Sequence, residues 1–371
     1  MSDIRISKVV IHELVKTQHQ PIQPSNLRNE VLGVDLDPVN KLVAGVASLY
    51  GKRNNMAHYG TFRNGEGRGN FPDAFESYAK IPTPTDQVFI DLSLEAMGAL
   101  FLKAENIHAA SGGYLLFADY SNAQGRFFII AMIKQKEGMR LSRQLVPEEL
   151  TQLDLDRLYQ AARINFGKLS AYQTATESDR QEQNYLSFVS PSNSKTAAGY
   201  FVTALGCAQG TASARATDTI IRESVGFFRQ HDELSRYRQA FKNDLLDLLT
   251  RKEREGSSVK LSEIEGLARR YIPSDEPGRA DEIADDLIAH LNDEENAVPV
   301  EFPVSKAMLV RHRQIRYKAN NWDIAFERTA LGEGDDAQVQ YDRDRNRIIL
   351  NSVPSGLVDM IREEIENQTT R

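Results

Sequence analysis

The amino-acid sequence predicts an α+β protein with three parts: an antiparallel sheet with helices in the N-terminal unit, a helical middle region, and a small α/β C-terminal unit. Two observations carry this prediction. The apolar stretches at 113–120 and 126–135 are separated only by the short turn 121–125, which ends in a glycine that easily adopts a positive φ. Strands joined by so short a turn pair antiparallel. Residues 213–255 then repeat apolar side chains at three- and four-residue spacing, which is typical of helices.

The length of the chain predicts more than one structural unit. A chain of 371 residues is too long for one compact core. We expect an α+β N-terminal domain over 1–212, a helical region over 213–297 and a small α/β C-terminal domain over 298–371, with Val298-Pro299 at the second junction.

The elements of the first part follow from local signals. Residues 37–50 predict a helix because Asp37 can cap it and Pro38 suits its first turn. Residues 63–70, rich in Gly and Asn, predict a loop, and 85–105 predict a second helix. Further strands are expected at 161–172 and 185–189.

The remaining elements are predicted by the same reasoning. Within 213–255 the apolar stripe, which includes Tyr237, Phe241, Leu245, Leu248 and Leu249, indicates a core or a seam between helices. A short helix is expected at 262–271, and the acidic segment as far as residue 295 continues helical. The C-terminal unit is expected to contain strands near 322–328, 337–341 and 347–350 and a helix from Pro354.

Composition excludes several classes of protein. The single cysteine, Cys207, rules out an internal disulfide and a zinc site built from several cysteines, and we expect it to be buried and inert. The longest apolar runs, such as 127–133, are far short of the roughly 20 residues that span a bilayer. The start of the chain lacks the pattern of a signal peptide. We therefore expect a cytoplasmic protein with no membrane association.

No motif in the chain predicts catalysis or a cofactor. Gly65, Gly67 and Gly69 lack the context of a phosphate-binding loop. The 342–346 segment resembles the start of a calcium loop, but Arg347 and Val353 stand where Gly and Glu are needed, so it predicts a polar hairpin tip. The histidines fall in no zinc-binding pattern. We expect no catalytic residues, no metal, no cofactor and no small-molecule substrate.

The segment 185–207, YLSFVSPSNSKTAAGYFVTALGC, combines a strand, a polar loop and a helix that Ser192 or Ser194 can cap. It resembles the signature region of the bacterial 37-kDa nucleoid-associated proteins, in which "YL.F" leads to a helix ending in "LGC". Similar motifs occur in the same order along the chain: the opening element from Ile4 to Leu14, a "YG.F" turn at 59–62, an "ARIN" strand ending at Asn165, and a closing strand and "P..L" turn at 348–357.

This resemblance implies a non-catalytic nucleoid-associated protein that binds chromosomal DNA and contributes to chromosome organisation. Only Lys195 is basic in the loop before the "LGC" helix, where some members of the family carry several bases. The resemblance therefore gives no DNA contact at that place, and the contact has to be sought elsewhere.

Charge is segregated along the chain. The net charge is −7, so a protein of this composition must concentrate its positive charge locally to bind DNA. Between 275 and 301, ten acids accompany the single base Arg279, whereas no acid occurs between Val304 and Trp322. The candidate DNA-binding residues are the bases that follow this change of sign: Lys306, Arg311, Arg313, Arg316 and Lys318.

A second candidate set lies on the helical region and includes Arg215 and Arg222, among interleaved acids that could equally form a salt-bridged face. Neither set matches a module that reads base sequence. We therefore expect binding to double-stranded DNA that is led by phosphate contacts and weakly specific.

Further interpretations remain open from the sequence. An enzyme that acts on nucleic acid is the least favoured of them, because the motifs assemble no metal-binding constellation. In the alternative function, the protein is an interaction scaffold whose acidic segment, 275–301, mimics DNA or docks a basic partner, and its association with the nucleoid is indirect. We also expect a homodimer, because the apolar stripe from Tyr237 to Leu248 exceeds what a lone surface helix needs and because linking two modest sites strengthens DNA binding.

Overall fold

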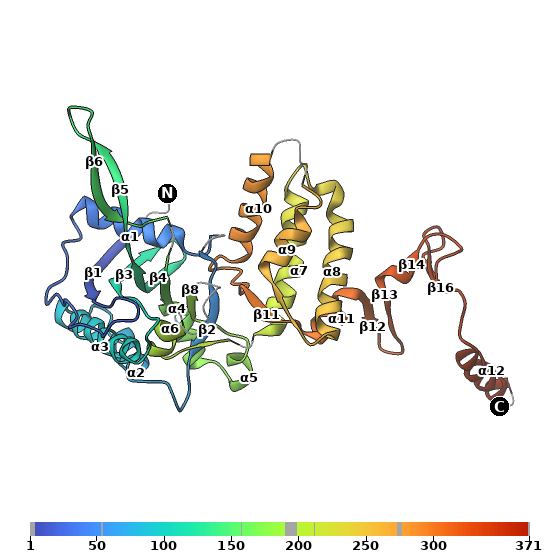
Figure 1. The fold of residues 1–371 in the computed structure, drawn as a ribbon. Coiled ribbons are helices and arrows are strands. Elements are labelled where there is room, and N and C mark those ends of the chain that lie inside the picture. The colour runs from blue at the N-terminus through green and yellow to red at the C-terminus, as the bar shows by residue number, and fades with distance from the viewer. Residues whose placement is uncertain are drawn as a thin grey trace. The chain divides into compact units, whose positions relative to one another are not determined.

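The computed structural model describes residues 4–52, 55–156, 158–189, 199–210, 212–272 and 277–369. The chain forms two compact units, Met1–Val304 and Ser305–Arg371. The first unit contains both the sheet and the helical region (Figure 1). The α+β class is confirmed, while the boundaries at 212 and 297 stay predictions. Ser192, Ser194 and Lys195 lie outside the described residues.

An antiparallel sheet of seven strands forms the centre of the first unit. Its central strands read as continuous apolar runs because both faces are covered; every residue from Phe127 to Ile133 is buried. In spatial order the strands are β1 (Arg5–Leu14), β3 (Gly113–Asn122), β4 (Gly125–Ile133), β7 (Gln160–Asn165), β8 (Leu186–Val189), β2 (His58–Phe62) and β9 (Cys207–Gln209).

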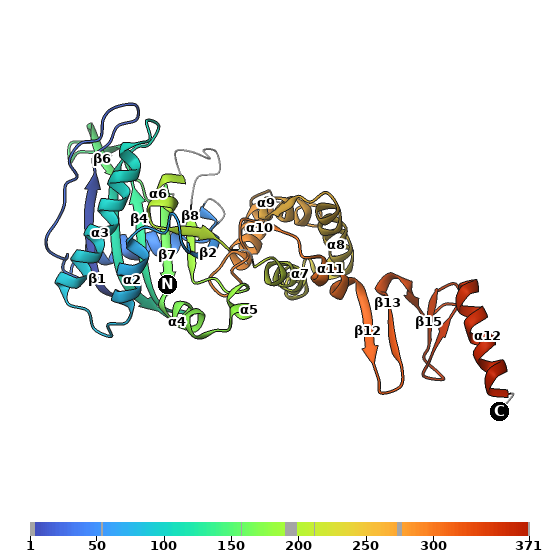
Figure 2. The same cartoon turned by 90° about the horizontal axis from the view of Figure 1, so that it is seen from below.

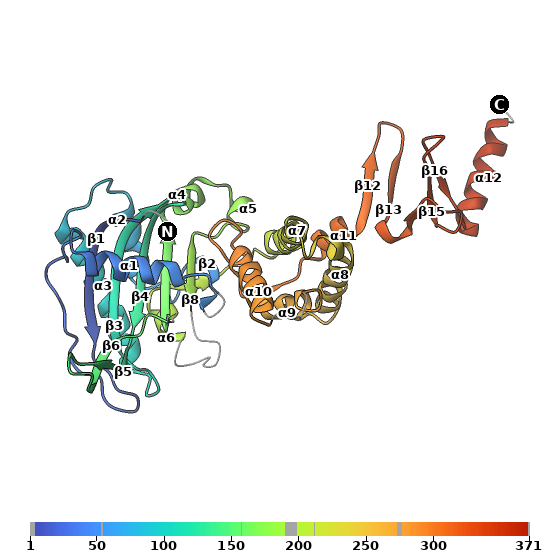
Figure 3. The same cartoon turned by 90° about the horizontal axis from the view of Figure 1, so that it is seen from above.

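Helices cover the two faces of this sheet unequally. One face is packed by α2 (Phe71–Ala79), α3 (Asp86–Glu105), α4 (Phe166–Thr174) and α6 (Gly199–Ala204), with Phe75 and Phe89 against Phe128. Figure 2 shows these helices in front of the strands. Figure 3, from the opposite side, shows α1 (Asp37–Leu49) across the other face, where Val43 and Val46 pack into the core.

The helical region consists of α7 (Ser213–Gln230), α8 (Arg238–Arg254), α9 (Leu261–Ala268) and α10 (Pro277–Leu291), with a short hairpin of β10 (Ser258–Lys260) and β11 (Glu301–Pro303). The rings of Phe228 and Phe241 stack with their centroids 3.9 Å apart. Phe241, Leu245 and Leu249 are fully buried. The apolar stripe is therefore used inside the chain, which removes the observation on which we expected a homodimer.

The second unit begins with α11 (Lys306–Arg313), which leads into a hairpin of β12 (Gln314–Lys318) and β13 (Asp323–Glu327). A three-stranded sheet of β14 (Leu331–Gly332), β15 (Val339–Asp342) and β16 (Arg347–Leu350) follows, and α12 (Ser355–Thr369) comes last. The expected C-terminal strands and helix are confirmed. The 342–346 segment is the turn between β15 and β16, in which Asn346 has φ 47°.

Several local predictions were wrong. The predicted strand 161–172 ends at Asn165, whose side chain accepts a hydrogen bond from the Lys168 amide at 3.0 Å and caps α4. The "YG.F" segment is part of strand β2 rather than a turn. Asp37 lies in the first turn of α1 and does not cap it. The prediction also omitted α2 and a hairpin of β5 (Gln135–Leu141) and β6 (Pro147–Leu153).

Among the described helices, none combines the length and the apolar character needed to cross a membrane.

Candidate nucleic-acid interface

The family-like motifs of the N-terminal part meet at one end of the sheet. Strand β2 lies between β8 and β9, and Phe62 is paired with Cys207. The Phe62 amide donates a hydrogen bond to the Tyr185 hydroxyl at 2.9 Å, and the Arg63 amide donates one to the carbonyl of Gly206 at 2.8 Å. These motifs therefore form the β8–β2–β9 edge of the sheet and the hydrogen bonds that hold it together.

Two glycines of these motifs are required by close backbone contacts. A Cβ atom at Gly60 would lie 1.8 Å from the carbonyl oxygen of Ala208. One at Gly206, where φ is +64°, would lie 2.1 Å from the carbonyl oxygen of Arg68. Both motifs thus have structural roles in the described chain.

The "ARIN" segment holds a buried charge cluster. Arg163 on β7 donates to Glu294 Oε2 at 2.7 Å, and its guanidinium lies 4.2 Å from the centroid of the Tyr50 ring. Asn165 Nδ2 donates to Glu294 Oε1 at 3.1 Å, and Lys168 Nζ lies 2.9 Å from the same oxygen. Glu294 therefore has three partners contributed by β7 and α4.

Charge attraction outweighs burial in this cluster. Burial acts to raise the pKa of Glu294, but the charges of Arg163 and Lys168 hold this pKa below its usual value. Burial likewise acts to lower the pKa of Arg163, and the Glu294 carboxylate raises it. Both groups are thus charged in the folded protein.

A neighbouring asparagine completes the joint between the sheet and the helical region. Asn292 donates from Nδ2 to the carbonyl of Ala57 at 2.9 Å and accepts from the Ala57 amide at 2.6 Å. The Tyr59 hydroxyl donates to the carbonyls of Asn292 and Asp293. The end of the acidic segment is therefore part of the fold of the first unit.

The β12–β13 hairpin separates basic from apolar side chains. Adjacent residues of a strand point to opposite faces. Arg316 and Lys318 share one face with Asp323, whereas Ile315 and Tyr317 share the other with Ile324 and Phe326. Arg316 forms an ion pair of 2.8 Å with Asp323, and the hydrogen bond raises the pKa of Arg316. Arg313 forms another ion pair, of 3.4 Å, with Glu327.

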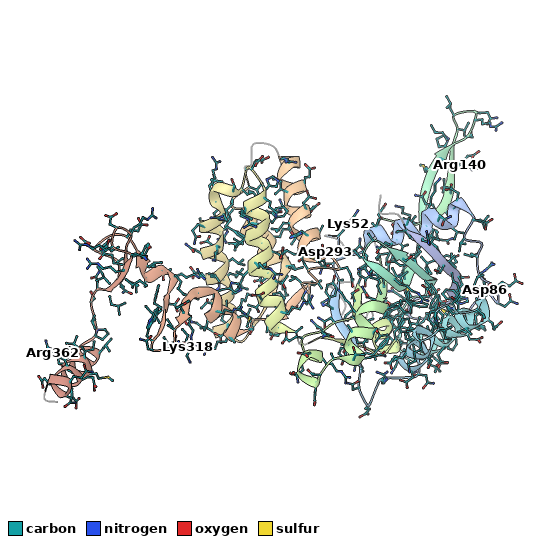
Figure 4. All side chains as sticks on the ribbon, turned by 180° about the vertical axis from the view of Figure 1, so that it is seen from behind. Lys52, Asp86, Arg140, Asp293, Lys318 and Arg362 are labelled. Carbon is teal, nitrogen blue, oxygen red and sulfur yellow. The ribbon has the colours of Figure 1, made fainter. Side chains whose placement is uncertain are left out.

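The other three predicted bases of this unit are exposed. Lys306 and Arg311 lie on α11 and Lys318 ends β12; Figure 4 labels Lys318. Among the described residues these three form no ion pair. The structure therefore divides the predicted set into two bases that stabilise the hairpin and three whose charge is not paired.

The second predicted set, Arg215 and Arg222, lies among acids, as expected if these bases belong to a salt-bridged face rather than to a DNA-binding surface. Arg222 on α7 contacts Glu223 at 2.9 Å and Asp218 at 4.0 Å. Arg215 is exposed at the start of the same helix, and its amide donates to Glu182 at 3.1 Å. Because Arg215 and Arg222 belong to the first unit and Lys306 to the second, the predicted bases form two separate sets.

Sequence reasoning missed one exposed surface. The hairpin β5–β6, here called the arm, projects from the sheet in Figure 1, and Figure 4 labels Arg140 on it. Arg140 is paired with Glu148 at 3.0 Å, and Arg143 forms no ion pair in the described part of the chain. Met139 and Leu145 are 73% and 76% exposed. The run from 138 to 147 contains no acid, a signal that could have identified the arm.

The described residues offer little for catalysis. They contain no group of three or more His, Cys, Asp or Glu side chains arranged to hold a metal. Cys207 is buried, and burial raises the pKa of its thiol. A cavity of about 550 Å³ between α8 and α9 is lined largely by charged side chains, unlike the mostly apolar pockets that bind small molecules.

Comparisons with known proteins agree with the motifs. A family model described as nucleoid-associated protein YejK matches residues 10–357. The chain is 24% identical over 366 residues to a nucleoid-associated protein of Pseudomonas paraeruginosa, which covers 98% of this chain and 99% of that protein. It is 27% identical over 280 residues to a nucleoid-associated protein of Azotobacter vinelandii, covering 76% and 77% of the two chains. The resemblance drawn from the motifs is confirmed.

Proposed function

The chain belongs to the nucleoid-associated protein YejK family, and from this premise we propose that it binds duplex DNA directly, with weak sequence preference, through exposed bases. Membership in the family places the protein at the bacterial nucleoid, within the cytoplasm. The observation that carries the proposal is the exposed set Lys306, Arg311 and Lys318, which forms no ion pair among the described residues of an acidic chain.

These bases suit phosphate contacts. Lys and Arg bind DNA largely by releasing counterions from phosphates, and a contact to phosphate carries no base sequence. The short strands of the hairpin and the two turns of α11 provide no recognition helix for the major groove. Weak sequence preference follows from contacts of this kind.

The arm is a second surface for the same ligand. Arg140 and Arg143 can reach phosphates, and the exposed Leu141 and Leu145 are the type of side chain that architectural proteins insert between base steps in the minor groove. The exposed apolar side chains at the tip are unfavourable in water, and a DNA groove would bury them while the two arginines contact phosphates.

The scaffold alternative has less support. Of the acids in 275–301, Glu294 is used in the buried cluster, Asp281 pairs with Arg269 at 2.8 Å and Glu282 pairs with Arg279 at 2.7 Å. Acids with partners inside the fold present less charge to a basic protein. Direct DNA binding is therefore the function that we favour.

The proposal includes no catalysis, because Cys207 is buried and the described residues assemble no metal-binding cluster. Duplex and single-stranded DNA incubated with the protein and magnesium or manganese should stay intact. Protein-dependent cleavage that persists through repurification would contradict this part of the proposal.

Direct binding is tested by titrating a labelled duplex with the protein at several salt concentrations. The test variant is Lys306→Ala with Arg311→Ala and Lys318→Ala. We expect weaker binding and a salt slope that falls by about 0.9 for each lost phosphate contact. A variant that replaces Arg311, Arg313 and Arg316 is less informative, because it also removes the two ion pairs of the hairpin.

The control is Arg343→Ala with Arg345→Ala and Arg347→Ala, which removes the same charge from the β15–β16 turn and the start of β16 in the same unit. It also removes the ion pairs Arg343–Glu333 and Arg347–Asp342, so circular dichroism must first show that the variant is folded. The control should keep the wild-type slope. Arg140→Ala with Arg143→Ala tests the arm in the same assay. Wild-type binding that is insensitive to salt, or equal slopes for the wild type and all three variants, would refute direct binding through these surfaces.

A further inference from the structure

The tip of the arm gathers exposed apolar side chains. Leu141 and Val146 are 65% and 56% exposed, and Met139 and Leu145 beside them are more exposed still. Because neighbours along a strand point to opposite faces, Met139 and Leu141 share one face of β5 and Arg140 lies on the other. An exposed apolar patch on a folded unit indicates a contact surface.

The backbone of the tip holds one of these leucines in an unfavourable conformation. Leu145 has φ 61°, in the left-handed region that glycine and asparagine adopt more easily than bulky residues do. The turn is fixed by hydrogen bonds: the Ser142 amide donates to the carbonyl of Val146 at 2.9 Å, and the Leu145 amide donates to the carbonyl of Ser142 at 3.0 Å. The Val146 amide donates to the Ser142 hydroxyl at 3.1 Å. Strain of this kind persists at functional sites, so an exposed, strained leucine indicates a contact with another molecule.

The charge around the tip suits a polyanion. Arg143 lies in the turn and forms no ion pair among the described residues. Arg140 pairs with Glu148, but both side chains are exposed and such surface pairs contribute little, so a phosphate can replace the carboxylate. The acids Glu148 and Glu149 lie behind the turn on β6, and none occurs between 138 and 147. The apolar tip is therefore flanked by arginines.

The dimensions of duplex DNA decide how such a tip is used. The major groove admits a two-stranded ribbon, which reads bases there with hydrogen-bonding side chains, whereas the tip carries apolar side chains at 139, 141 and 145. The minor groove of undistorted B-DNA is about 6 Å wide, which is too narrow for a ribbon. Apolar wedges enter it by separating base steps, which kinks the duplex toward the major groove.

We propose that the arm bends DNA: Leu141 and Leu145 insert at a base step from the minor groove, while Arg140 and Arg143 contact the phosphates on either side. This activity rests on the proposed function, direct binding to duplex DNA, and adds a deformation of the duplex to it. The hydrogen-bonded turn suits the task, because a fixed leucine pushes bases apart whereas a loosely held one gives way. The protein thus changes the shape of the DNA that it binds.

A wedge favours DNA that deforms easily. Pyrimidine–purine steps unstack at low cost and are the expected sites of insertion in an intact duplex. A nick lowers the cost of a kink further, because one backbone no longer resists it. We expect a duplex with a central nick to bind about tenfold more tightly than the intact duplex of the same sequence. Selection by deformability agrees with weak sequence preference, since it reads no base edges.

Bending is measured by energy transfer between dyes at the two ends of a short duplex at saturating protein. The wild type should raise the transfer above that of free DNA. Leu141→Ser with Leu145→Ser should keep the wild-type salt slope, because all bases remain, but leave the transfer at the value of free DNA and lose the preference for the nick. The control, Leu27→Ser with Leu102→Ser, removes two exposed leucines elsewhere in the first unit and should bend DNA as the wild type does.

The outcomes separate bending from binding. A wild type that binds with a steep salt slope but leaves the transfer unchanged refutes bending alone, and a contact of the arm with the major groove would give this result. A leucine variant that bends DNA like the wild type refutes the wedge. Absence of salt-dependent binding refutes the proposed function and the wedge together. A change in the molar mass of the leucine variant without DNA, measured by light scattering, assigns the tip to a contact between copies and also refutes the wedge.

A further variant, Leu145→Asn, tests whether this leucine is retained for DNA bending rather than for folding. Asparagine adopts the left-handed region more readily than leucine, so the midpoint of urea unfolding should be equal to that of the wild type or higher. Energy transfer in the DNA complex should nevertheless fall. A lower midpoint would show that the leucine stabilises the fold, and undiminished transfer would show that it is no wedge; either result overturns the proposal.

Discussion

Arg163 and Glu294 form a buried ion pair of 2.7 Å that joins strand β7 to the segment after α10. The two side chains are 9% and 7% exposed. Removing one member of such a pair leaves an uncompensated charge in the interior, which costs far more than the loss of a surface pair.

We predict that Glu294→Gln lowers the free energy of unfolding by about 3–5 kcal/mol, because Arg163 and Lys168 then lose their counter-charge. Urea denaturation measures this change. The control, Glu148→Gln, breaks the exposed pair with Arg140 and should cost about 1 kcal/mol or less. Similar costs for the two variants would contradict a stabilising role for the buried cluster.

The second prediction concerns the glycines of the sheet edge. Gly60→Ala and Gly206→Ala should each lower the melting temperature, because the added methyl groups would lie 1.8 Å and 2.1 Å from backbone oxygens. Gly98→Ala in α3 is the control, since its Cβ meets no atom within 4 Å, and it should stabilise the helix by about 0.5–1 kcal/mol. Thermal melts distinguish these opposite signs.

The third prediction is a loss of stability in mild acid through His12. Burial, with a smaller contribution from the charge of Arg28, lowers the pKa of His12 to about 4 from its ordinary value of 6.5. The Arg28 amide donates to Nδ1 at 3.1 Å, so this nitrogen must stay unprotonated. Between pH 6.5 and about 4 the unfolded chain binds the proton more readily, and stability falls as the pH falls.

Unfolding free energies measured across this range should therefore decline less steeply for His12→Gln than for the wild type. His108→Gln, which removes an exposed imidazole, serves as the control and should follow the wild-type curve. Parallel curves for all three proteins would show that protonation of His12 is not linked to folding.

The fourth prediction is that Cys207 does not react in the folded protein. Burial raises the pKa of its thiol, and the thiolate is the form that reacts with disulfide reagents. A colorimetric thiol reagent should modify the residue only after denaturant is added. Rapid modification of the native protein would reveal opening of the sheet edge near β9.

Residues 113–135 and 213–255 illustrate what the sequence predicts well. In both stretches the spacing of the apolar residues and the short connection between elements can be seen locally, and they indicate the strands β3 and β4 and the helices α7 and α8. Periodicity reports local geometry, so it indicates these elements even though distant residues such as Phe75 and Phe89 also pack against Phe128.

Other elements depend on partners far along the chain. Gly60 suggests a turn, yet it lies in strand β2. A glycine is needed there because a neighbouring backbone occupies the space that a side chain would take. The arm strands carry mainly polar side chains, so no apolar alternation marks them. Glu294 stands in an acid-rich segment typical of solvent-exposed helices, and its partner Arg163 is separated from it by 131 positions.

The candidate interface was predicted in part. The basic segment could be identified from the sequence because it contains several bases in a continuous run without an acid. It could not find the partners of Arg316 and Arg313, because Asp323 and Glu327 approach them only through the register of the hairpin. Charge density along a chain therefore identifies a segment, and strand pairing decides which of its charges are exposed.

The joint between Glu294 and β7 has a consequence for how the protein is made. A nascent chain that has been synthesised only as far as residue 212 already possesses every strand of the large sheet, yet Arg163 and Lys168 have no carboxylate and Ala57 has no Asn292 to bond. The sheet cannot reach its final stability until the ribosome has released the end of α10. Folding of the first unit is therefore completed late in translation, when its last segment docks against strands that emerged long before.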